Sequence, residues 1–154
     1  MKRSAGIAVY KMEDNKLKVL LCHFGGPYRE NKMGSWSFPK GEADFKESIL
    51  ETAHREFTEE TNLKVSTPIA YLGARKTSHN KLTIMFYTEA DFDLSNCKSN
   101  TFTMEFPKDS GKIQEFPEMD KYAWMDINEA KDKIIGNQLY FLNKLEDKLH
   151  NFTF

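Results

Sequence analysis

Residues 41–63 read GEADFKESILETAHREFTEETNL, and this stretch decides the fold. Its apolar residues recur at steps of one, three and four, which predicts a helix with one buried face. These residues are Ile49, Leu50, Ala53 and Phe57. Asp44 and Glu47 have the spacing of a capping box, which marks a helix start. We therefore expect a helix from about Lys46 to Thr61.

The neighbouring face of this helix carries three glutamates, Glu56, Glu59 and Glu60. Steps of three and four bring their carboxylates close together, and like charges at that spacing destabilise a helix. A divalent cation removes the repulsion, and carboxylate oxygens are the ligands that magnesium and manganese prefer. A solvated acidic face is the better explanation for a lone Glu-x-x-Glu-Glu. The leading glycine, the capped helix start and Arg55, all at defined distances, favour the metal site here.

The rest of the chain has the composition of a globular protein. It has 154 residues, of which 40% are hydrophobic, and its 22 Lys+Arg against 23 Asp+Glu give a net charge of -1. This length predicts a single domain over residues 1–154, able to bury about two-thirds of its unfolded surface. The near-neutral balance argues against a nucleic-acid or membrane-surface binder, because both usually carry a basic excess. A small anionic ligand is compatible with it.

Cysteine use and hydropathy bear on the location of the protein. Cys22 and Cys97 are far apart and have no metal-ligand spacing, which fits a reducing compartment. The apolar stretch from Ala5 to Tyr10 is too short for a secretory signal and ends at a lysine. No apolar run approaches the roughly 18 residues that span a membrane. We therefore expect a cytoplasmic protein with no membrane partner.

Strand patterns lie on both sides of the predicted helix. Expected strands lie around residues 7–9 and over 17–24, 36–38, 69–74, 82–87, 101–106 and 122–125. Turns are expected at Asp14-Asn15 and near 78–80, and residues 91–115 are otherwise expected to be irregular. Two further helices are expected over 127–135 and 138–150. The second presents Leu139, Leu142, Leu145 and Leu149 at helical spacing.

The polar residues of the opening stretch have a spacing that resembles the signature of the Nudix hydrolases. That signature is Gly, five residues, Glu, seven residues, Arg-Glu, an aliphatic or aromatic residue, any residue, Glu-Glu, any residue, Gly and an aliphatic residue. The matching residues are Gly41, Glu47, Arg55, Glu56, Phe57, Glu59, Glu60 and Leu63. Asn62 stands where the family has glycine, at a position past the helix end that favours the left-handed conformation, and asparagine is the next-best residue there. We call residues 41–63 the Nudix box.

The resemblance covers the chain from Ser4 to about Leu145. It implies an α+β fold, a Nudix-type α/β/α sandwich around a mixed β-sheet. It also implies an enzyme that hydrolyses a phosphoanhydride in a nucleoside diphosphate linked to another moiety.

The resemblance implies roles for residues of the box. The implied ligands of magnesium, or of manganese, are Glu56, Glu59, Glu60 and the backbone carbonyl of Lys40. Glu47 and Arg55 are implied to pair behind these ligands and to hold the loop against the helix.

The implied reaction needs a carboxylate that accepts the proton of the attacking water. Glu56 and Glu60 fit this role, as does a glutamate in the loop before Trp124, where some family members keep theirs. The candidates in that loop are Glu118 and Glu115. A solvated loop carboxylate explains Glu118 equally well, and it explains Glu115 better.

Basic and aromatic residues near the box are the candidates for substrate contacts. Arg29 and Lys32 lie in the turn-rich segment 25–35, and Lys40 lies next to the box. Arginine suits a two-pronged phosphate contact and lysine acts as a point charge. The aromatic candidates for stacking on a base are Trp36, Tyr28 and Phe116. Packing in the core is the competing explanation for these aromatic residues.

Comparison with subgroups of the family narrows the substrate. The lead-in from Trp36 to Gly41, Trp-x-x-Pro-Lys-Gly, resembles that of diadenosine tetraphosphate hydrolases. The ADP-ribose subgroup has a proline where this chain has His79, and the dinucleoside polyphosphate subgroup often has a tyrosine near Asn80 and Lys81. The motif of the coenzyme A subgroup is missing.

We therefore expect a small-molecule nucleotide substrate, either a dinucleoside polyphosphate or a nucleoside triphosphate, and no stable nucleic-acid partner. The alternative is a nucleotide-binding or regulatory module on the same fold that does not hydrolyse its ligand. Such modules usually have gaps among the box glutamates, and this chain has none. The sequence does not indicate an oligomeric state.

Overall fold

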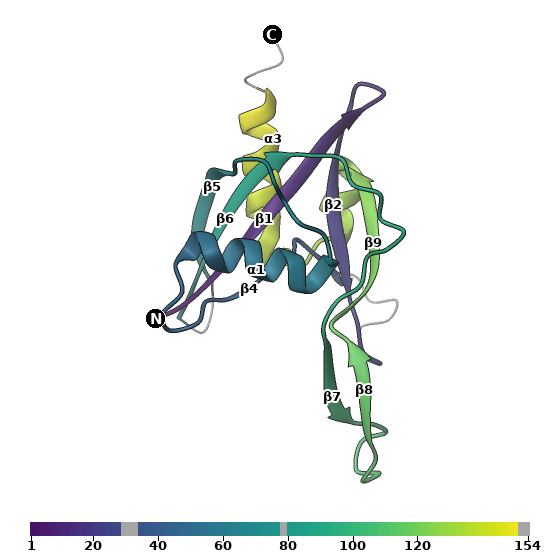
Figure 1. The fold of residues 1–154 in the computed structure, drawn as a ribbon. Coiled ribbons are helices and arrows are strands. Elements are labelled where there is room, and N and C mark those ends of the chain that lie inside the picture. Colours follow the sequence, from purple (N-terminus) through teal and green to yellow (C-terminus); the bar gives the residue numbers. More distant parts are fainter. Residues whose placement is uncertain (29–33, 78–79, 151–154) are drawn as a thin grey trace.

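The computed structural model describes residues 1–28, 34–77 and 80–150. Within these ranges the chain forms a seven-stranded mixed sheet with helices on both faces (Figure 1). Its strands are β1 (Lys2–Glu13), β2 (Lys16–Phe24), β3 (Trp36–Ser37), β4 (Lys40–Glu42), β5 (Ala70–Thr77), β6 (Lys81–Glu89) and β9 (Met119–Asp126). The helices are α1 (Ile49–Thr61), α2 (Ile127–Lys133), the 3₁₀ turn η1 (Gly136–Gln138) and α3 (Leu139–His150). No helix in the described residues is long and apolar enough to cross a membrane.

Strand β1 organises the sheet, because it pairs with β2, β4 and β6. The main path runs β3-β2-β1-β6-β5, and β9 pairs with β2. Strands β1 and β6 are parallel, with Lys2 opposite Lys81, whereas β4 pairs antiparallel with β1. The register of β4 places Gly41 opposite Ala5. The Nudix box therefore starts in a strand that belongs to the central sheet.

Alternation along β1 divides its apolar side chains between two cores. The core under α1 contains Ala5, Ile7, Val9, Leu20, Ala53, Phe57 and Val65. The core on the other face, against α2 and α3, includes Ala8, Leu21, Phe38, Met85, Phe141, Leu142 and Leu145. Because helices cover both faces of a mixed sheet, the expected α+β class and α/β/α sandwich are confirmed (Figure 1).

The expected hairpin turns are present where the structure describes them. Asp14 and Asn15 join β1 to β2 with φ values of 53° and 61°, as a two-residue type I′ turn requires. Strands β5 and β6 also form a hairpin, in which Asn80 has a φ of 59°. Residues 78–79 of that turn lie outside the described residues.

The start of the box helix differs from the expectation. Helix α1 begins at Ile49, not near Lys46, and its N-cap is Ser48, whose side chain accepts a hydrogen bond from Glu51 N (3.1 Å). Asp44 and Glu47 form a turn ahead of the helix, in which Asp44 N donates to Glu47 Oε1 (3.2 Å). The capping-box spacing therefore marks this turn and not the first helical residue.

Two leucines that were expected in the core are exposed. Leu50 is 52% exposed and Leu139 is 36% exposed. The inward side of α1 follows Ile49, Ala53 and Phe57, four residues apart, and Leu50 lies in the first turn of the helix, about 60° from the middle of that side. At the start of α3, Phe141 fills the core position next to Leu142 and Leu145.

The segment 91–115 contains more structure than expected. Strand β7 (Thr101–Glu105) was predicted, but it pairs with a second strand, β8 (Ile113–Pro117), which was assigned to a loop. The expectation of a loop was wrong because both faces of β8 are largely exposed, so its polar residues do not alternate with a buried apolar set. Figure 1 shows the β7–β8 hairpin extending away from the sandwich.

Candidate active site

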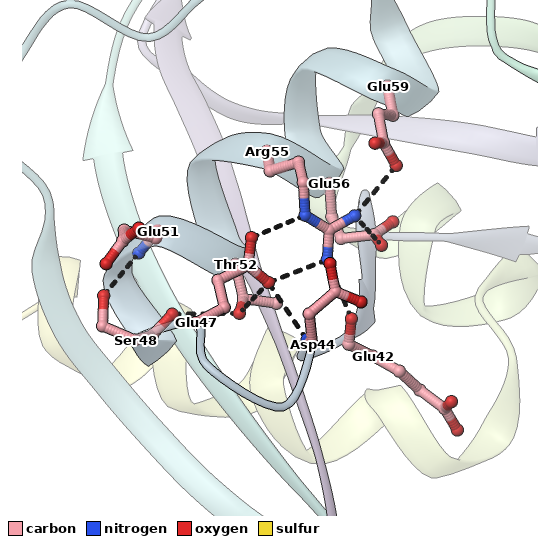
Figure 2. A network of polar contacts seen from close by, with 9 residues as sticks. All are labelled: Glu42, Asp44, Glu47, Ser48, Glu51, Thr52, Arg55, Glu56 and Glu59. Carbon is pink, nitrogen blue, oxygen red and sulfur yellow. Dashed lines mark hydrogen bonds and ion pairs between the residues drawn. The ribbon is translucent and has the colours of Figure 1, made fainter.

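Arg55 holds the turn that precedes α1 against the helix (Figure 2). Its Nε donates to Glu47 Oε2 (2.7 Å) and its Nη2 donates to Glu47 Oε1 (2.9 Å), which makes a two-pronged ion pair. The Nη2 atom also donates to the carbonyl of Glu42 in β4 (2.9 Å). Hydrogen bonds from Arg55 and Thr52 lower the pKa of Glu47 to about 2. The expected pairing of Glu47 with Arg55 is thus present.

The same guanidinium contacts two of the predicted metal ligands. Its Nη1 donates to Glu56 Oε1 (2.8 Å) and to Glu59 Oε2 (3.0 Å), as Figure 2 shows. Arg55 therefore offsets part of the repulsion that the sequence predicts between the glutamates of this helix. The sequence analysis did not anticipate this shared contact.

Glu60 is the buried member of the acidic cluster. Glu60 is 6% exposed, and its Oε1 accepts a hydrogen bond from Lys40 N (3.2 Å). Burial, followed by the negative charge of Glu56, raises the pKa of Glu60 to about 8. Burial also raises the pKa of Glu56, although Arg55 opposes this. Both carboxyls are therefore held in surroundings that disfavour their charged form.

Gly41 allows the strand and the helix to meet. A Cβ atom at this position would clash with the carboxyl group of Glu56. Glycine at this position therefore lets β4 pass close to the Glu56 carboxyl where it contacts Arg55; a larger residue would displace that carboxyl. The first glycine of the box serves this approach and not a turn.

The last turn of α1, which carries Glu59 and Glu60, is fixed from several sides. The carbonyls of residues 57–61 accept, in order, from Thr61 Oγ1, Asn62 N, Asn100 N, Tyr122 Oη and Lys98 N, at 2.6–3.3 Å. A helix end leaves its last four carbonyls, here those of residues 58–61, without donors inside the helix, and these contacts supply partners for them. Asn62 adopts the left-handed conformation (φ 63°, ψ 16°) that was expected at the position of the missing glycine.

The two loop glutamates of the prediction lie in different places. Glu118 lies between β8 and β9, where its N–H donates to Asn100 O (2.9 Å) and its carbonyl accepts from Gly25 N (2.8 Å). Burial and the charge of Glu59 raise the pKa of Glu118, and Glu118 in turn raises the pKa of Glu60. Its charge therefore acts on the carboxyls of α1. Glu115 is an exposed residue of β8, opposite Thr103.

The donor set suits a divalent cation, although the carboxylates do not surround a single point. Among the described residues, no three acidic, histidine or cysteine side chains lie close enough to hold a metal ion together. Glu56 and Glu60 nevertheless raise each other's cost of ionisation, and Glu60 has one backbone donor to its Oε1. A nearby cation favours the charged form of both carboxyls and so removes this cost of ionisation.

A cavity of about 280 Å³ opens on the Lys40 side of the box. Its lining includes Lys2, Lys40, Lys81, Glu42, Gln138 and Phe141. Burial lowers the pKa of Lys40, while the carboxylates of the box partly restore it. Glu42 lies 3.4 Å from the ammonium of Lys81 and 4.0 Å from that of Lys2. Three lysines and one glutamate thus contribute to the lining of this cavity.

The residues predicted to contact the substrate lie in different parts of the molecule. Lys40 lines the cavity, whereas Trp36 is half-buried against the core and meets the ring of His23 at 5.2 Å between centroids. Arg29 and Lys32 lie outside the described residues. The sequence analysis missed Lys2 and Lys81, because nothing in the sequence signals that their strands are parallel and in register.

Comparisons with known proteins agree with this geometry. A family model described as the NUDIX domain matches residues 2–145. No curated protein matches the sequence. Solved structures with 16–19% sequence identity to this chain show that it shares their fold.

Three solved structures illustrate the likeness. An Ap4A hydrolase from C. elegans, solved as a binary complex, has a TM-score of 0.66 at 19% identity, covering 99% of this chain and 100% of that chain. The NUDIX domain of Shewanella oneidensis NrtR, complexed with ADP ribose, has a TM-score of 0.68 at 16% identity, covering 96% and 87%. A mutT/nudix family protein from Listeria innocua has a TM-score of 0.64 at 18% identity, covering 98% and 95%. Because the NUDIX model spans most of the sequence, the chain belongs to the Nudix family and is a pyrophosphohydrolase of that family.

Proposed function

We propose that this chain hydrolyses a phosphoanhydride of a nucleotide in a reaction that depends on a divalent cation. The best candidates for the substrate are dinucleoside polyphosphates, followed by nucleoside triphosphates. The observation that carries the proposal is the buried Glu60 carboxyl, which feels the charge of Glu56 and accepts a hydrogen bond from the backbone of Lys40, a residue of the lysine-lined cavity. In this proposal the phosphates of the substrate approach the acidic face of α1 from the side of Lys40.

In this proposal the cation is magnesium, with manganese as the alternative. Its ligands are Glu56, Glu59, Glu60 and the backbone carbonyl of Lys40. When bound, the ion supplies charge neutralisation of the phosphate oxygens and a lowered pKa of a coordinated water. Glu60 suits the role best because it is buried and short of donors, while Glu59 is shared with Arg55.

The other residues of the site position these groups and move a proton. Arg55 and Glu47 keep the turn before α1 in place through their two-pronged ion pair. Glu118 is our first candidate for the general base, because it lies outside the helix, its charge acts on Glu60, and its pKa is raised. Glu56 and Glu60 are the alternatives for this role.

Substrate binding is assigned to the cavity side of the box. Lys40, Lys2 and Lys81 attract the phosphates as point charges. Trp36 and Arg29 stay candidates for contacts to the rest of the nucleotide. The lead-in from Trp36 to Gly41 and the likeness to an Ap4A hydrolase both favour a dinucleoside polyphosphate. The ADP-ribose-bound neighbour adds that nucleotide to the compounds to be tested.

We also place the protein in the cytoplasm, with a small-molecule nucleotide and no nucleic acid as its partner. Its two cysteines, Cys22 and Cys97, are both free thiols, as a reducing compartment maintains them.

The test is a panel of diadenosine tetraphosphate, nucleoside triphosphates and ADP-ribose, incubated with magnesium, manganese or EDTA, with the products separated by chromatography. We expect turnover of at least one compound with metal and none with EDTA. Glu60→Gln should lower kcat by at least 100-fold, because it removes a charged ligand. Glu51→Gln, an exposed glutamate of the same helix, is the matched control and should behave as wild type.

The panel also decides the role of Glu118. If Glu118 is the base, Glu118→Gln lowers kcat with little change in KM, and the acidic limb of the pH profile disappears. A silent Glu118→Gln assigns the base to α1. Binding of a nucleotide without turnover of any compound in the panel would contradict the proposed hydrolysis and favour a binding module.

A further inference from the structure

The β7–β8 hairpin carries an aromatic surface next to Glu118. Its rings follow one another, with centroids 5.7 Å apart from Tyr28 to Phe106, 6.1 Å from Phe106 to Phe116 and 6.0 Å from Phe116 to Phe102. Tyr28 is 48% exposed, and the three phenylalanines are partly exposed. We call these four residues the hairpin aromatic surface.

Two glycines hold the segment after β2 against the hairpin. Gly25 N donates to the carbonyl of Glu118 (2.8 Å), and a Cβ at Gly25 would clash with the carbonyl of Pro117. At Gly26, which has a φ of 93°, a Cβ would lie 3.0 Å from the ring of Phe102. This segment therefore lies flat on the hairpin and adds its tyrosine to the three hairpin rings.

The base of the hairpin is tied to the box helix. Asn100, which directly precedes β7, donates its N–H to the carbonyl of Glu59 (2.9 Å) and accepts from Glu118 N (2.9 Å). A hairpin of two strands has little stability of its own, so these contacts and the aromatic packing fix its position. The aromatic surface therefore begins where the acidic face of α1 ends.

The Glu60 carboxyl interacts with residues of both neighbouring regions, Lys40 and Glu118. On one side its Oε1 accepts from Lys40 N (3.2 Å), and Lys40 lines the cavity. On the other side the charge of Glu118 acts on it. Figure 1 shows β4 beneath α1 and the hairpin extending beyond the C-terminal end of α1. The hairpin aromatic surface thus lies next to the C-terminal end of the acidic face.

We propose that the hairpin aromatic surface stacks against the second nucleobase of a substrate in which a polyphosphate joins two nucleosides. The proposal rests on the function proposed above, with the phosphates of the substrate at the box carboxylates. A base presents an aromatic face, and its stacking on a tyrosine or phenylalanine changes affinity by about ten-fold or more. A nucleoside triphosphate has no second base and leaves this surface empty. The surface therefore selects dinucleoside polyphosphates.

The test compares kcat and KM for diadenosine tetraphosphate and ATP in Tyr28→Leu and Phe116→Leu. We expect KM for diadenosine tetraphosphate to rise about ten-fold, because stacking is lost, and KM for ATP to change less than two-fold. Tyr28→Phe should keep the wild-type KM, since the ring is retained. Ile113→Ala is the matched control, because Ile113 is 68% exposed and lies on the opposite face of β8.

Equal changes in KM for both substrates, or no change for either, would overturn the proposal. So would a variant that alters the sedimentation coefficient of the free protein, because the surface would then join two copies of the chain. If Phe116→Leu does not fold, the comparison of Tyr28→Leu with Tyr28→Phe decides the test, because Tyr28 is exposed. If wild type hydrolyses neither compound, the proposed function fails, and calorimetric binding of both compounds in EDTA by the same variants still tests the surface.

Discussion

The Glu60 carboxyl is buried beside another carboxyl, and this predicts how the stability of the protein depends on pH. Burial and Glu56 raise its pKa from 4.5 to about 8 in the folded protein. Between these two pH values the folded state keeps a proton that the unfolded state releases, so the stability falls as pH rises through this window. Above pH 8 both states are ionised and the loss is complete, on the order of a few kcal/mol.

Urea unfolding of the metal-free protein at pH 5, 7 and 9 measures this effect. Wild type should lose stability from pH 5 to pH 9, whereas Glu60→Gln should lose clearly less. Glu47, whose pKa is lowered to about 2, acts in a different range, because its contribution is lost only as pH falls from 4.5 towards 2. Parallel plots of stability against pH for wild type and Glu60→Gln would contradict the raised pKa of Glu60. The control variant Glu51→Gln should follow wild type.

At the scale of the element, α1 works as a rigid support for its carboxylates because both of its ends are fixed. Ser48 caps the start, and Arg55 ties the preceding turn to the helix. At the other end, Tyr122 from β9 donates its hydroxyl to the carbonyl of Glu60 (2.6 Å). This bond connects the backbone of a predicted metal ligand to the central sheet.

Tyr122→Phe should therefore weaken the site without removing any ligand. The lost hydrogen bond leaves the carbonyl of Glu60 without this partner, which costs about 1–2 kcal/mol of stability. We expect a higher magnesium concentration for half-maximal activity and a kcat lowered several-fold, with an unchanged pH profile. Tyr71→Phe, at an exposed tyrosine of β5, is the control. A variant that loses stability but keeps the wild-type magnesium dependence would limit Tyr122 to a structural role.

The elements also show which features a sequence reveals. The position of α1 and the left-handed Asn62 were predictable, because helical periodicity and helix ends depend on nearby residues. The strand β8 was not, since an exposed strand has no buried face to impose an alternating pattern. The helix start was misplaced because the carboxylate of Glu47 serves Arg55 and the turn at Asp44 instead of a cap.

At the scale of the whole molecule, the site joins parts of the chain that no local pattern connects. The cavity depends on the parallel pairing of Lys2 with Lys81 and on Gln138, a buried residue whose Oε1 accepts from Phe38 N (2.8 Å). Glu118 reaches α1 only because Asn100 bridges the two. The sequence predicted the acidic face, which lies within one helix, and Lys40 next to it, but not Lys2 and Lys81, whose proximity depends on the topology of the sheet.

The same topology makes the stability of the whole fold sensitive to a bound cation. The acidic face gathers Glu56, Glu60 and Glu118 around the end of α1, and each has a pKa raised by burial. A ligand that binds only the native state at a hundred times its dissociation constant adds about 2.7 kcal/mol of stability, which corresponds to about 5–10 °C in Tm for a chain of this size.

Millimolar magnesium or manganese should therefore raise the Tm of wild type above its value in EDTA. Sodium chloride at equal ionic strength is the control, since it screens charge without binding carboxylates specifically. Glu60→Gln should raise the metal-free Tm at pH 8 and lose most of the response to metal, whereas Glu51→Gln should keep both wild-type values. A wild-type Tm that is the same in magnesium, manganese and EDTA would show that the acidic face of α1 does not bind these ions.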